Sequence, residues 1–158
     1  MRDRPTISNA AMLRIAGIYA QKQLDWEEYG VLMPHDGSRR TEFDVIELGV
    51  VAWLRKEIGL RDSRKAWRSI RSRLLERPPV DTLHVVWEDQ DGVAVACYDE
   101  AEVKRAVEHG RMVRVFNLTA EISRVRGAFR TEVEDSKPRP PIRRRDENSK
   151  ATKKDSKE

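Results

Sequence analysis

The feature that most constrains this chain of 158 residues is a change of hydrophobic period at Pro78-Pro79. Before the two prolines, apolar residues recur every three or four positions, which is typical of amphipathic helices. After them, Leu83, Val85 and Trp87 alternate with their neighbours, which is typical of a half-buried strand. Helices followed by a mixed segment of strands and helices predict an α+β fold.

Residues 1–79 predict four helices and a short hairpin. The first helix is capped by Ser8 and runs to about residue 16, and the second spans about 20–29 and ends at Gly30. Only three residues separate these two helices, so the pair is a candidate helix-turn-helix.

The rest of this segment is predicted to continue with a hairpin and two more helices. The hairpin covers 31–40 and turns at Asp36-Gly37. A capping-box-like pair then starts a helix over about 41–57, and a further helix runs over about 63–76 after Gly59. Four arginines of this last helix are expected to lie largely outward as a solvated face: Arg64, Arg68, Arg71 and Arg73.

Residues 80–135 are predicted to form a small α+β module that serves as a partner or oligomerisation surface. A β-hairpin over 83–98 is followed by a helix that Asp99 opens, a strand over 112–118 and a last helix that starts at Thr119. Residues 136–158 hold three prolines and no aromatic residue, and they are predicted to be a disordered basic tail.

Charge is divided unevenly along the chain. Residues 1–79 carry 15 Lys or Arg against 11 Asp or Glu, a net of +4, whereas 80–135 carry a net of −5 and 136–158 a net of +5. A basic segment has the sign expected of a surface that meets phosphate, and the acidic middle does not.

Several function classes are excluded by what the sequence lacks. No apolar run approaches the ~18–20 residues of a bilayer span, and the N-terminus has no signal-peptide pattern, so a cytoplasmic protein without a membrane partner is expected. One cysteine, Cys97, and three scattered histidines give no zinc spacing. Nucleophile motifs and phosphate-cradling glycine loops are also missing, which predicts no cofactor, no metal and no enzymatic activity.

The most informative stretch joins the second helix to the predicted hairpin. It reads Trp26-Glu27-Glu28-Tyr29-Gly30-Val31-Leu32-Met33-Pro34 and is followed by Arg39-Arg40 and a capped amphipathic helix. This pattern resembles the MerR family of winged helix-turn-helix DNA-binding proteins, in which an aromatic-Glu-x-x-Gly-Leu-Leu-x-Pro motif joins the second helix to the wing. The resemblance covers about residues 8–75 and implies that double-stranded DNA is the partner.

Five residues are the predicted DNA contacts. A helix of about ten residues fits the major groove, where the polar side chains of its N-terminal half meet base edges. The wing arginines would reach phosphate or the flanking minor groove. The predicted contacts are Gln21, Lys22 and Gln23 on the helix and Arg39 and Arg40 on the wing.

Three functional interpretations stay open at this point. The leading one is a sequence-specific transcriptional regulator, with 80–135 as a surface for a homodimer, a ligand or another protein. The second is an antitoxin that binds operator DNA through 1–79 and its toxin through 80–135, because the sequence also resembles, more weakly, helix-turn-helix antitoxins. The third is a phage excisionase-type protein that bends DNA with the same winged fold.

Overall fold

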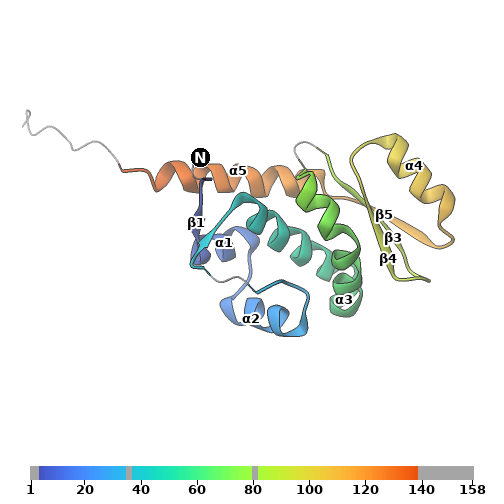
Figure 1. Ribbon diagram of the computed structural model, residues 1–158, viewed down its shortest axis with the longest axis horizontal. Coiled ribbons are helices and arrows are strands. Elements are labelled where there is room, and N and C mark those ends of the chain that lie inside the picture. The colour runs from blue at the N-terminus through green and yellow to red at the C-terminus, as the bar shows by residue number, and fades with distance from the viewer. Residues whose placement is uncertain (1–3, 35–36, 80–81, 139–158) are drawn as a thin grey trace, which may run out of the picture.

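The computed structural model describes residues 4–34, 37–79 and 82–138 as an α+β fold (Figure 1). The elements before the two prolines are β1 (Ile7–Ser8), α1 (Asn9–Ala16), α2 (Ala20–Tyr29), β2 (Arg39–Arg40) and α3 (Glu42–Glu76). Those after them are β3 (His84–Glu88), β4 (Val93–Cys97), α4 (Glu100–His109), β5 (Val113–Asn117) and α5 (Thr119–Asp135). The tail predicted for 136–158 lies outside the described residues from 139 onward.

Helix ends follow their capping residues closely. The Ser8 side chain accepts a hydrogen bond from the backbone N–H of Ala11, and Thr41 with Asp44 forms a complete capping box at the start of α3. Asp99 accepts from the backbone N–H of Glu102 at the start of α4. The predicted starts of these three helices are therefore confirmed, because each depends on contacts within one turn of helix.

Helix α3 contains the two helices that the sequence predicts, joined across a kink instead of a loop. It bends at Gly59, whose φ of 82° lies in the left-handed region that glycine adopts without strain, and the second half follows directly. Arg71 of the second half donates from Nε to Glu47 Oε2 of the first half at 2.8 Å. The two halves therefore fold back on each other, as the ribbon shows (Figure 1).

The hairpin predicted for 31–40 is wrong in its pairing. Arg39–Arg40 pairs antiparallel with Ile7–Ser8, so the small ribbon joins two segments that are distant in sequence. Val31 and Leu32 are buried instead, and their backbone N–H groups both donate to the carbonyl of Trp26 at the end of α2. Those N–H groups are thus used in a helix cap and cannot form a strand ladder. Asp36, in the predicted turn, lies outside the described residues.

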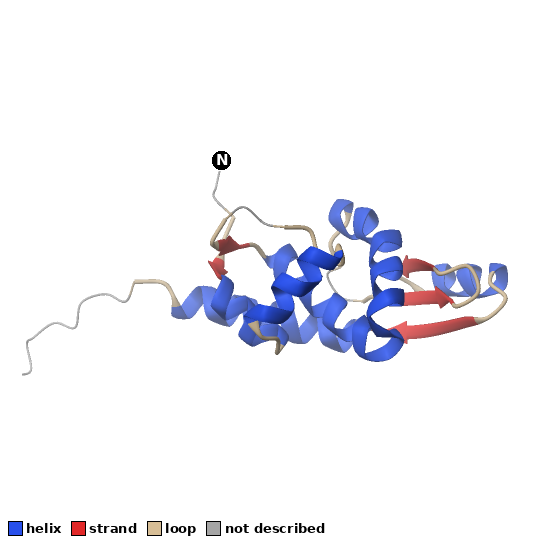
Figure 2. Cartoon of the chain, turned by 90° about the horizontal axis from the view of Figure 1, so that it is seen from below, coloured by secondary structure: helices blue, strands red, loops and turns tan. Residues whose placement is uncertain are grey.

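The C-terminal strands form one antiparallel sheet in the order β4-β3-β5. In Figure 1 this sheet lies between α3 and α4, and Figure 2 shows the strands grouped at one end of the molecule. One sheet face packs on α3, where the rings of Trp53 and Phe116 meet edge to face at 5.2 Å. Buried apolar residues from before and after the prolines form a single cluster, with α5 packed against α1 and α3.

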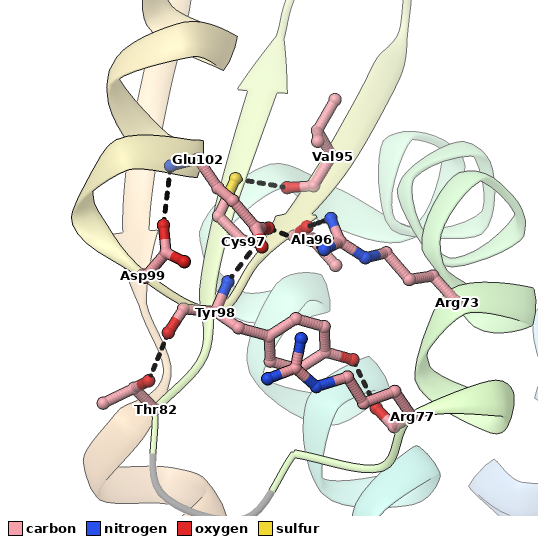
Figure 3. Close-up of polar contacts among 9 residues, drawn as sticks. All are labelled: Arg73, Arg77, Thr82, Val95, Ala96, Cys97, Tyr98, Asp99 and Glu102. Carbon is pink, nitrogen blue, oxygen red and sulfur yellow. Dashed lines mark hydrogen bonds and ion pairs between the residues drawn. The ribbon is translucent and has the colours of Figure 1, made fainter.

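A polar junction ties the end of α3 to the sheet (Figure 3). The Arg73 guanidinium donates to the carbonyl of Ala96 and to Glu102 Oε2. The guanidinium groups of Arg73 and Arg77 lie 4.9 and 4.7 Å from the ring centre of Tyr98. Arg73 was expected to face solvent, and that expectation is wrong because it holds the edge strand β4 in place. The expectation of a solvated side chain is also wrong for Arg71, which is ion-paired with Glu47.

Candidate nucleic-acid interface

Helices α1 and α2 are joined by a short turn of three residues. Gly17 ends α1 in the left-handed conformation, and its backbone N–H returns to the carbonyls of Arg14 and Leu13. Helix α2 starts after Tyr19, which is 82% exposed and provides no side-chain cap, so the first N–H groups of α2 have no capping side chain. Gly30 ends α2 with a φ of 82°. The predicted bounds of both helices are confirmed.

The inner side of α2 is fixed by an amide network. Gln23 and Asn9 exchange two side-chain hydrogen bonds of 3.0 and 3.1 Å, and Arg40 Nε donates to Asn9 Oδ1 at 2.9 Å. The side chains of Gln23 and Arg40 are each only 6% exposed. A side chain held inside the protein cannot reach a base or a phosphate, so we correct the prediction for these two residues. They position α2 and β2 against α1.

The other three predicted contacts lie on the surface. Gln21 and Lys22 are exposed on α2, and Gln21 donates from Nε2 to Asp25 Oδ1 at 2.9 Å. Arg39 is exposed on β2 and donates from Nε and Nη2 to Thr6, at 3.1 and 2.9 Å. A guanidinium has five N–H donors, so Arg39 keeps donors for another acceptor.

A groove runs between α2 and the bend of α3. It is lined by Lys22, Asp25, Trp26, Glu28 and Tyr29 from α2 and by Arg55 and Leu60 from α3. The buried ring of Trp26 forms part of its floor, and charged groups of both signs line its sides. Lys22, a predicted contact, therefore lines the same groove as Arg55, which the sequence did not indicate.

Three arginines of α3 gather along this groove and at its end. The Arg64 guanidinium lies 5.1 Å from the ring centre of Tyr29, at the C-terminal end of α2. A Cβ at Gly30 would lie 3.4 Å from Arg64 Nη2 and 3.5 Å from Arg68 Nη2, so the two guanidinium groups converge on that glycine. Together with Arg55, these residues are called the α3 arginine cluster below.

The α3 arginine cluster lacks acidic partners. In the part of the chain that the structure describes, no carboxylate lies within 4.0 Å of any of the three guanidinium groups. The Nε atoms of Arg55 and Arg64 are also buried without a hydrogen-bond partner. Each guanidinium has four further N–H donors, and an anion such as a phosphate group could bind through these.

Helix α2 itself does not supply the positive charge. It carries Lys22 against Asp25, Glu27 and Glu28, a net of −2. Cations for a phosphate backbone therefore have to come from neighbouring elements, and the α3 arginine cluster is placed to supply them. The sequence favoured a solvated face over a second DNA contact for Arg64 and Arg68 and did not indicate Arg55, because convergence on Gly30 depends on how α3 folds back.

No group of three or more His, Cys, Asp or Glu among the described residues could hold a metal ion. Cys97 is buried on β4, and burial raises the pKa of its thiol, with the nearby Glu102 carboxylate adding to the effect. No helix in the described ranges is both long and apolar enough to cross a bilayer.

Comparison of the whole chain with protein-family models finds no matching family, and comparison with curated proteins finds no match.

Proposed function

We propose that this protein is a sequence-specific DNA-binding protein, acting as a transcriptional regulator through a winged helix-turn-helix of MerR type. The observation that carries the proposal is the exposed polar face of α2 beside an arginine cluster without acidic partners. In this interpretation α2 enters the major groove, and the α3 arginine cluster contacts the phosphate backbone beside it.

The dimensions of α2 support this placement. Its 10 residues span about 15 Å at 1.5 Å per residue, and a helix about 10–12 Å across with its side chains fits a major groove about 12 Å wide. Gln21 can pair with the edge of adenine and Lys22 with that of guanine. The amide network on the opposite side of α2 fixes the rotation of the helix, so these two side chains face outward together.

Arg39 supports the wing part of the proposal. It lies on the two-stranded ribbon of β1 and β2, which takes the place of the hairpin expected from the sequence. Its bonds to Thr6 tie the first described residues to this ribbon, and its remaining donors face solvent. A phosphate contact there would hold the duplex at a second point, away from the α3 arginine cluster.

The experiment selects binding fragments from the genome of the native host and measures their affinity by fluorescence anisotropy. Gln21→Ala and Lys22→Ala should each weaken specific binding by about 5- to 150-fold and relax the preference at one base pair. Lys104→Ala is the matched control, because Lys104 is exposed on α4 and its loss removes the same charge. Equal effects of Lys22→Ala and Lys104→Ala, or no duplex binding at low ionic strength, would refute the proposal.

A further inference from the structure

The two edge strands of the C-terminal sheet, β4 and β5, differ in whether their outward backbone groups have hydrogen-bond partners. On β4 the outward carbonyl of Ala96 accepts a hydrogen bond from Arg73, and the strand packs against α3. On the β3 side of β5, the Leu118 N–H donates to the carbonyl of Leu83, and the carbonyl of Met112 accepts from Asp89. The backbone groups of alternate residues point to the same side of a strand.

The outward groups of β5 follow from this alternation. Since residues 112, 114, 116 and 118 face β3, the N–H and C=O groups of Val113, Val115 and Asn117 face away from the sheet. In the described part of the chain, no hydrogen bond is formed by these six groups. Edge strands of this kind pair readily with another chain unless they are blocked.

Two apolar side chains at this edge are exposed. Val115 is 45% exposed, on the sheet face opposite Phe116 and α3, and Met112, just before the strand, is 65% exposed. Burial of these side chains would add hydrophobic stabilisation to the hydrogen bonds of a paired strand.

We propose that β5 pairs antiparallel with β5 of a second copy of this chain, with the two-fold axis at Val115. In this register Val115 lies opposite Val115 of the second copy, and Val113 lies opposite Asn117 of the second copy. All three outward residues then form hydrogen-bonded pairs, which gives six inter-chain bonds. The two sheets become one sheet of six strands, and the interface is self-complementary, as a two-fold dimer requires.

Charge favours this register over the one centred on Arg114. With the axis at Val115, Arg114 lies opposite Phe116 of the second copy, on the face where Arg114 already contacts its own Phe116 at 5.7 Å. A shift of the axis to Arg114 would put two arginines directly opposite each other and form fewer backbone bonds. The register at Val115 is therefore the one that satisfies both the backbone and the charges.

The net charge of residues 80–135 also determines how dimer formation depends on salt. Residues 80–135 carry a net of −5 in each copy, so two modules repel each other at low ionic strength. Added salt screens this repulsion and strengthens the pairing, whereas added salt weakens DNA binding. The dimer does not rest on the proposed function, and the opposite responses to salt separate the two.

Disulfide trapping tests the register directly. Paired residues at such a position lie about 5.5 Å apart at Cα, which suits a disulfide, so Val115→Cys should cross-link to its own copy under mild oxidation. Val93→Cys is the matched control, because Val93 is 46% exposed on the far strand of the same sheet. The native Cys97 is buried and does not compete. Cross-linking of both variants to the same extent would overturn the proposal.

Analytical ultracentrifugation tests the dimer without a new cysteine. The parent should show a monomer–dimer equilibrium in the micromolar range, as expected of a small interface, and it should tighten with salt. Val115→Pro removes one outward N–H and leaves the β3 pairing intact, so it should fold and stay monomeric. Val115→Thr keeps the N–H and the branched shape and should dimerise like the parent. The proposal would be overturned if the parent stayed monomeric up to about 200 μM. It would also be overturned if the Val115→Pro variant dimerised as strongly as the parent.

Discussion

The α3 arginine cluster makes a quantitative prediction about salt. The perturbation is the double variant Arg64→Gln, Arg68→Gln, which removes the two guanidinium groups that converge on Gly30. Glutamine keeps a polar side chain of moderate length, so the helix should stay intact. In the proposed complex, each of these arginines neutralises a backbone phosphate.

The magnitude follows from the number of proposed phosphate contacts. Arg39 and the three arginines of the α3 cluster are four cations without ion pairs in the described residues. With about 0.9 of logarithmic slope for each neutralised phosphate, they contribute a slope of about 3.6. A rise from 50 to 200 mM salt should then weaken binding by about 150-fold in the parent and about 12-fold in the double variant.

The assay is fluorescence anisotropy with one selected duplex at four salt concentrations from 50 to 200 mM, a range over which the expected change is large. The control is Arg105→Gln, Arg130→Gln, which removes the same charge from exposed positions on α4 and α5. Its slope should equal that of the parent. If both double variants change the slope equally, the effect is one of net charge, and the reasoning from the unpaired arginines is refuted.

Two further predictions concern the packing that supports the site. Asn9→Ala should lower the free energy of unfolding by about 2–4 kcal/mol in urea denaturation, because it leaves the Gln23 amide and the Arg40 Nε buried without their partner. Asn9→Asp, which keeps an acceptor for Arg40, should cost less, and equal losses would contradict the role of the network. Burial raises the pKa of the Glu47 carboxyl above its ordinary 4.5, with Arg71 opposing the effect. Folded Glu47 thus holds a proton more tightly than the unfolded chain does, so its contribution to stability is full below pH 4.5 and is lost as the pH rises through its folded pKa. Glu47→Gln should therefore cost more stability at about pH 4 than at about pH 7, and a cost that grows with pH would contradict this.

Local signals in the sequence were sufficient for most of the secondary structure. The start of α1 at Ser8, the end of α2 at Gly30 and the capping box of Thr41 with Asp44 are all contacts within a few residues. The alternating strands after the prolines and their connecting helix were also predicted in order. These features depend on backbone preference and hydrophobic period, which a single sequence records.

The sequence did not indicate which distant segments pair with each other. A short apolar run after Gly30 has the pattern of a strand, but Val31 and Leu32 instead fill the core beneath α2. The partner of Arg39–Arg40 is Ile7–Ser8, more than 30 residues earlier, and nothing in either dipeptide specifies the other. Gln23 and Arg40 were assigned to the surface because both are polar, yet Asn9 satisfies their hydrogen bonds inside the fold.

The arginines of α3 show most clearly why the site could not be found from the sequence. Arg64 and Arg68 are spaced like any solvated face, and so are Arg71 and Arg73. The structure gives Arg71 and Arg73 carboxylate partners on other elements, Glu47 and Glu102, at 2.8 and 2.6 Å, and gives Arg64 and Arg68 none among the described residues. Arginines with a carboxylate partner hold the fold together, whereas those without one remain available to an anion. What separates a structural arginine from a candidate phosphate contact is therefore the residue opposite it, which only the tertiary fold determines.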